Sequence, residues 1–104
     1  MATYIMLNHF TDQGVRAIRE TTNRAEAVRE IAKKMGVSVR EIYWTMGHYD
    51  SVALFDAPDE ATITAFALAL GQAGNIRTEI LRAFNGEEMK SVLKKVGQRD
   101  AVPA

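Results

Sequence analysis

Three side chains that lie far apart in the sequence together supply the functional groups that proton transfer requires. His9 carries an imidazole, which can accept or donate a proton near neutral pH. Asp50 has a carboxylate that can orient such a ring, and Arg77 has a guanidinium that can stabilise a carboxylate or an enolate-like oxygen. These catalytic candidates predict proton transfer on an enolisable or aromatic substrate, with His9 as the base.

Aromatic and amide side chains in the same parts of the chain suit the binding of a small organic ligand. Ligand pockets are mostly apolar, and a few polar groups fix the orientation of the ligand. The ligand-binding candidates are Tyr43, Trp44, Tyr49 and Asn75.

Signatures of metal and cofactor binding are missing from the sequence. The absence of cysteine excludes disulfides, thiolate zinc sites and cysteine nucleophiles. His9, His48 and Asp50 have ligand types that suit zinc or iron, but the two histidines are not spaced i, i+4. No phosphate-binding loop, G-x-S-x-G elbow or H-E-x-x-H helix occurs. We therefore expect no metal and no cofactor.

Charge and hydropathy exclude further classes of partner. The chain has 104 residues, the size of one domain, with 13 Lys and Arg against 13 Asp and Glu. This balance offers no basic surface for nucleic acid. No apolar run approaches the roughly 18 residues of a membrane span, and residues 1–10 lack the pattern of a signal peptide. We expect a cytoplasmic protein that binds neither nucleic acid nor membrane.

The hydrophobic pattern predicts an α+β fold. Asn23 is expected to cap the first long helix, with Glu26 completing a capping box. The order βαββαβ, followed by a C-terminal helix, is that of the ferredoxin-like fold, with an antiparallel sheet in the order 4-1-3-2. We expect a single domain over residues 1–96 and a flexible tail over 97–104. Strands are predicted at 4–9, 39–46, 51–55 and 76–84, and helices at 23–36, 61–70 and 86–96.

One face of this sheet is expected to be bare, because both main helices of the fold cover the other face. Strand 51–55 is apolar at the consecutive positions 52–55, and the first strand is apolar at 4–7, so both faces of each strand favour burial. A bare apolar face marks an interaction surface. The simplest partner is a second copy of the chain, in a closed two-fold dimer.

The 4-1-3-2 order also brings the candidate site residues together at one end of the sheet. The first strand ends beside the turn between the second and third strands, and beside the start of the fourth strand. We therefore expect His9 near Asp50, and Asn75 and Arg77 near His9, in a pocket that opens toward the bare face.

Several of these residues also have purely structural explanations. Asp50 is typical of a tight hairpin turn. Asn75 follows Gly74 in the way that many helices end. Tyr43 and Trp44 are neighbours in a strand and point to opposite faces, so at least one belongs to the core or to a dimer interface.

Short motifs spread along the chain resemble the GYD family. The G-x-Y-D motif for which the family is named matches at Gly47, Tyr49 and Asp50, and the likeness covers about residues 3 to 95. Ile80 departs from it, since a threonine is expected there. The resemblance implies a ferredoxin-like fold and a dimeric α/β-barrel assembly, and it implies no particular chemistry. Further similar runs lie at 11–14, 57–59, 74–79 and 81–84.

Two classes of function remain open at this point, and with them whether the protein is an enzyme. The first is a homodimeric small-molecule-binding protein, which could be a cofactor-independent enzyme for proton transfer, as in other dimeric barrels. The alternative is a non-catalytic structural or regulatory interaction module. The expected partners are a second copy, in a dimer or a higher assembly, and a small organic ligand.

Overall fold

The computed structural model describes residues 1–97. Gly97 ends the last helix, and the rest of the expected tail, 98–104, lies outside the described residues. The elements are β1 (Ala2–Phe10), α1 (Asp12–Arg16), a 3₁₀ helix (Ile18–Glu20), α2 (Thr21–Lys34), β2 (Ser38–Trp44), β3 (Ser51–Ala57), α3 (Glu60–Gln72), β4 (Ile76–Ala83) and α4 (Gly86–Gly97).

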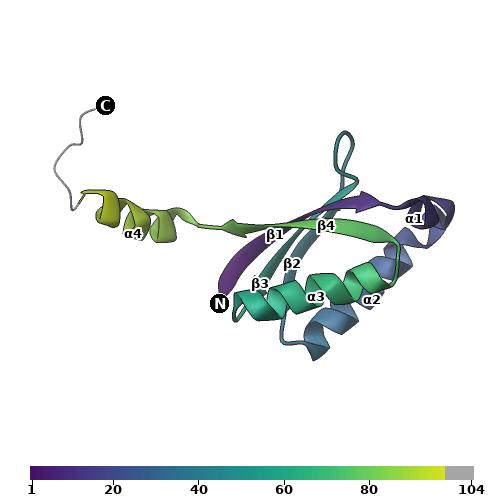
Figure 1. The fold of residues 1–104 in the computed structure, drawn as a ribbon, viewed down its shortest axis with the longest axis horizontal. Coiled ribbons are helices and arrows are strands. Elements are labelled where there is room, and N and C mark those ends of the chain that lie inside the picture. The colour runs from purple at the N-terminus through teal and green to yellow at the C-terminus, as the bar shows by residue number, and fades with distance from the viewer. Residues whose placement is uncertain (98–104) are drawn as a thin grey trace.

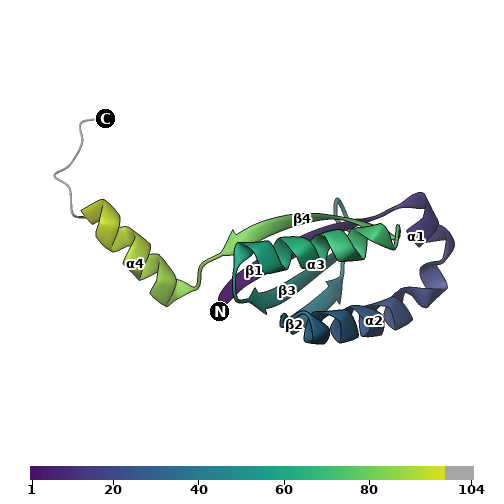
Figure 2. The ribbon, with the colours of Figure 1, turned by 60° about the horizontal axis from the view of Figure 1, so that its bottom comes forward.

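The four strands form one antiparallel sheet in the order β2-β3-β1-β4. Read from the other edge this is 4-1-3-2, so the predicted ferredoxin-like α+β fold is confirmed. Helices α2 and α3 lie side by side against the same face of the sheet (Figures 1 and 2).

Helix α2 begins two residues before the predicted position, and the predicted capping box is wrong. Its N-cap is Glu20, which makes no side-chain capping bond. The Asn23 amide instead donates a 2.7 Å hydrogen bond back to the Glu20 carboxylate. The reason is the 3₁₀ helix before it, which leads into α2 with Thr21 already in helical conformation (φ −59°, ψ −38°).

The core lies between the two helices and the sheet. Its largest fully buried side chains are Met6, Phe55, Ile63 and Phe66. The rings of Phe55 and Phe66 pack edge to face, with 5.2 Å between their centres, and this contact joins β3 to α3. Alternate residues of β1 and β3 point into this core, as the 2-residue period of a strand requires.

The other face of the sheet, here called the open face, is not covered by any helix of residues 1–97. Apolar side chains occupy its centre, because Ile5 lies opposite Leu54 in β3, and Leu7 lies opposite Val52. Tyr43 is directly across from Val52 and is 53% exposed. Leu81, across from Ile5 on β4, completes this apolar centre.

Helix α4 projects beyond the end of β4, away from the rest of the molecule (Figures 1 and 2). Asn85 and Glu88 form a capping box, in which each side chain accepts a hydrogen bond from the other residue's backbone N–H, at 2.8 and 3.0 Å. An ion pair of 2.9 Å between Arg82 and Glu88 joins α4 to the end of β4. The helix carries an exposed apolar stripe, the α4 stripe, made of Met89, Val92, Leu93 and Val96.

Candidate functional site

Three aromatic rings cluster on the open face, at the end of the sheet where the β2–β3 turn lies. The centre of the His9 ring is 4.8 Å from the centre of the Tyr49 ring and 5.0 Å from that of the His48 ring. The rings of His48 and Tyr49 are 4.8 Å apart. The turn therefore folds its two aromatic residues onto the end of β1. These residues are called the ring cluster below.

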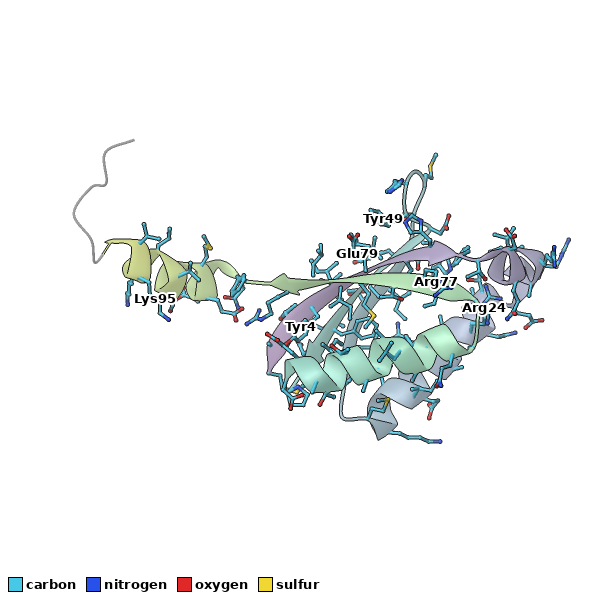
Figure 3. All side chains as sticks on the ribbon, viewed as in Figure 1. Tyr4, Arg24, Tyr49, Arg77, Glu79 and Lys95 are labelled. Carbon is cyan, nitrogen blue, oxygen red and sulfur yellow. The ribbon has the colours of Figure 1, made fainter. Side chains whose placement is uncertain are left out.

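A cation and a carboxylate on β4 border the ring cluster. Arg77 is the direct partner of His9 in the β1–β4 register, and Glu79 lies on the same face of the strand. The Tyr49 hydroxyl donates a 2.8 Å hydrogen bond to the Glu79 carboxylate. That bond raises the pKa of Tyr49 above its ordinary value, so at neutral pH the phenol remains a neutral donor. Figure 3 shows Tyr49 and Glu79 on the side of the sheet away from α2 and α3.

These side chains surround a shallow cavity of about 300 Å³ on the protein surface. It has the predicted location, at one end of the sheet on the open face. Of the predicted site residues, the structure brings together His9, Tyr49 and Arg77. The cavity is lined by His9, His48, Tyr49, Arg77, Thr78 and Glu79.

Asp50 lies beside the ring cluster, but its carboxylate is bound to the backbone. Its Oδ2 accepts a 2.8 Å hydrogen bond from the N–H of Phe10, and its own N–H donates to the carbonyl of Asn8 at 2.8 Å. Within residues 1–97, no hydrogen bond joins Asp50 to His9. The geometry thus gives Asp50 a structural task, which is to hold the β2–β3 turn against the end of β1.

The remaining ligand-binding candidates lie away from this cavity. Tyr43 is on the open face, over its apolar centre. Trp44 follows Tyr43 in β2 and therefore points to the opposite side of the sheet, toward the helices. Its Nε1 donates a hydrogen bond to the Thr21 hydroxyl at 2.9 Å. Asn75 precedes β4, where its side-chain oxygen accepts a 3.1 Å hydrogen bond from Gln13.

Sequence reasoning did not assign Glu79 and His48 to the site. Glu79 could have been found from the period of two in β4, which places it on the same face as Arg77. The topology places His48 at this end of the sheet, in the β2–β3 turn, but the sequence gives no signal for the direction of its ring, because the path of a turn determines where its side chains point.

The arrangement offers groups that can recognise a small ligand. In the part of the chain that the structure describes, no group of three His, Cys, Asp or Glu side chains could hold a metal ion. The three rings, which meet edge to face or tilted, offer aromatic surface to a planar ligand, and Arg77 offers a positive charge beside them. Among residues 1–97, no helix has the length and apolar character needed to cross a membrane.

Comparison with known proteins supports both the family resemblance and the fold. The GYD domain model matches residues 4–93. A protein of Thermus thermophilus named "Glutamine synthetase and cystathionine beta-lyase binding protein" is 32% identical over 95 residues, which is 90% of this chain and 100% of the relative. The solution structure of the C-terminal domain of the MgtC protein from Mycobacterium tuberculosis matches with a TM-score of 0.50 and 13% identity. That match covers 78% of this chain and 85% of the other, and it bears on the fold alone.

Proposed function

Because the chain belongs to the GYD domain family and is similar along most of its length to a relative named for the enzymes it binds, we propose that it is a non-catalytic protein-binding module. Its partner is a metabolic enzyme of the kind in that name, a glutamine synthetase or a cystathionine beta-lyase. The observation that carries the proposal is the α4 stripe, an apolar helix surface that no other part of residues 1–97 covers.

The position of α4 suits a docking element. The helix projects away from the sheet (Figures 1 and 2), and Arg82 joins it to the end of β4, because its guanidinium pairs with Glu88 at 2.9 Å and lies 4.5 Å from the centre of the Phe84 ring. The helix is therefore presented to other molecules rather than folded back on its own domain. An amphipathic helix of this kind binds by laying its apolar side in a groove of the partner.

The open face has a different role in this proposal, as the contact between two copies of the chain. No helix of residues 1–97 covers its apolar centre, and pairing with an identical face buries both copies at once. Small domains gain stability from such pairing because a short chain buries a low fraction of its own surface. A homodimer would present two α4 helices, which suits an oligomeric enzyme through avidity.

Binding of the purified full-length protein to the two enzymes of its own organism tests the proposal, with biolayer interferometry as the measurement. Leu93→Asp places a charge in the α4 stripe and should abolish binding. Ser91→Asp adds the same charge on the opposite side of α4 and should leave it intact. No binding of the unmodified protein to either enzyme would overturn the proposal.

Light scattering separates the dimer contact from partner binding. Leu7→Lys places a charge at the centre of the open face, so it should halve the molar mass of the particle. Leu93→Asp should leave the molar mass at that of a dimer. If the unmodified protein is a monomer at micromolar concentration, the proposed role of the open face is refuted.

A second candidate function rests on the ring cluster and its cavity. There the protein would bind a small aromatic or enolisable ligand, with His9 as proton acceptor and Arg77 facing the developing negative charge. Turnover of such a substrate that is lost in His9→Ala and kept in His48→Ala would support it. Turnover unchanged in His9→Ala would remove it.

A further inference from the structure

A second hollow lies on the opposite side of the sheet from the ring cluster, between α2, α3 and the strands. Its inner part has a volume of about 70 Å³. That is several times the roughly 10–15 Å³ that one water needs. An adjoining part of about 240 Å³ shares Arg24, Val28, Leu70 and Ile76 with it. This hollow is called the helix-side cavity below.

Small residues explain why the helix-side cavity stays open. Ala25 on α2 faces Ser51 and Ala53 on β3 across the inner part, where larger side chains would close the space. The larger apolar residues around them, among them Val28 and Ile42, form its walls. The core is thus incompletely filled at this end of the sheet, and Phe55, whose other neighbour is the ring of Phe66, lies at the border of the unfilled space.

The floor of the cavity is polar, which is unusual for the core face of a sheet. Asn8 and Ser51 are only 6% and 7% exposed, and both line the inner part. The Asn8 amide donates to the Ser51 hydroxyl at 3.1 Å and accepts from the Thr78 hydroxyl at 2.9 Å. Within residues 1–97, no hydrogen bond uses the proton of the Ser51 hydroxyl, so this donor is available to a molecule in the cavity.

A fixed positive charge stands at the edge where the two parts of the cavity meet. The Arg24 guanidinium donates to the carbonyls of Ala17 and Gly14, at 2.7 and 3.2 Å, and lies 5.9 Å from the centre of the Phe10 ring. None of the ion pairs among the described residues involves Arg24. Figure 3 shows Arg24 near the start of β4, on the side of the sheet where the helices lie.

We propose that the helix-side cavity binds a small aromatic monocarboxylate that carries an oxygen substituent. Its carboxylate pairs with Arg24, because a guanidinium held by two carbonyls is already oriented and has donors left for an anion. Its ring lies among the apolar walls, and its oxygen substituent accepts a hydrogen bond from Ser51. This site is separate from the protein-binding surfaces and from the ring cluster, so it does not depend on the proposed function.

Trp44 provides a direct measurement, because it is the one tryptophan of the chain, it lines the cavity and it is 45% exposed. Its fluorescence is followed while the full-length protein is titrated with 4-hydroxyphenylacetate. We expect a saturable change in fluorescence. The uncharged 4-hydroxyphenylacetamide should bind about 10- to 100-fold more weakly, because this is the range for the loss of a charge-assisted hydrogen bond. Saturation-transfer NMR on the ligand gives a second readout that does not rely on Trp44.

Variants distinguish this site from the others. Arg24→Gln should bring the acid down to the affinity of the amide. Arg19→Gln, a change at an exposed arginine that does not line the cavity, should leave the affinity unchanged. Ser51→Ala should weaken 4-hydroxyphenylacetate and leave phenylacetate unaffected, a difference that a merely structural defect would not produce. Equal affinity for acid and amide, unchanged affinity for the acid in Arg24→Gln, or no binding by either readout at millimolar ligand would each overturn the proposal.

Discussion

The hydroxyl of Tyr49 and the carboxylate of Glu79 are joined by a 2.8 Å hydrogen bond that connects the β2–β3 turn to β4. These elements are not neighbours in the sheet, because β1 and β3 lie between β2 and β4. The bond therefore crosses over the end of β1, and it fixes the tyrosine ring 4.8 Å from that of His9. One exposed hydrogen bond thus joins the ring cluster to β4.

The first prediction concerns the ionisation of Tyr49. Its bond to Glu79 favours the neutral phenol and raises its pKa, so Glu79→Gln should lower the pH at which Tyr49 ionises. A raised pKa means that the bond stabilises the fold from neutral pH up to the ordinary tyrosine pKa and ceases to do so as the pH rises through the raised one. NMR titration of the Tyr49 ring measures this. Glu41→Gln, a change at another carboxylate of the open face, should leave the titration unchanged.

The second prediction concerns Gly14, where α1 packs against the residue before β4. A Cβ on Gly14 would lie 2.2 Å from the carbonyl oxygen of Asn75, which is backbone and cannot move aside cheaply. Gly14→Ala should therefore destabilise the fold by about 1–3 kcal/mol. Urea unfolding measures the loss.

Gly71 provides the matched control for this substitution. It lies within α3, and a Cβ there would meet nothing within 4 Å. Gly71→Ala should stabilise the protein by up to about 1 kcal/mol, because alanine is the better helix former. Equal effects of the two substitutions would contradict the role given to the Gly14–Asn75 contact.

The sheet was predictable because its strands carry strong local signals. Tyr4 to Leu7 and Val52 to Phe55 are apolar at consecutive positions, and turn residues separate them from the neighbouring elements. The βαββαβ order then leaves few arrangements, and it placed His9 correctly beside Arg77. The start of α2 was missed because Asn23 satisfies the capping pattern while the preceding 3₁₀ helix overrides it.

The candidate site was predictable in position and only partly in its contacts. Topology places Asp50 next to the end of β1, but whether its carboxylate meets the His9 ring or the Phe10 N–H depends on the path of the turn. The helix-side cavity had no signal in the sequence. It arises from the meeting of Ala25 with Ser51 and Ala53, and such a match of small residues across two layers is visible only in the packing.

The third prediction tests the structural task of Asp50. Asp50→Ala removes the acceptor of the half-buried Phe10 N–H, so it should cost about 1–2 kcal/mol of stability. The Phe10 amide should also exchange faster with deuterium. Asp12→Ala is the control, since Asp12 is exposed and its side chain makes no hydrogen bond within residues 1–97. An unchanged unfolding midpoint in Asp50→Ala would leave the carboxylate free for a role at His9.

The last prediction concerns the hold of α4 at low pH. The Asn85 N–H, followed by the Arg82 guanidinium, lowers the pKa of Glu88, so the charged form stabilises the capping box. This contribution is complete above the ordinary glutamate pKa and is lost as the pH falls through the lowered one. We expect α4 to fray first during acid titration, as NMR shifts of its amides would report.

Arg82→Gln should raise the pKa of Glu88 and move this fraying to higher pH, whereas Lys90→Gln, which removes the partner of Glu87, should not. Simultaneous loss of α4 and the sheet would show instead that the helix is held by contacts other than Glu88.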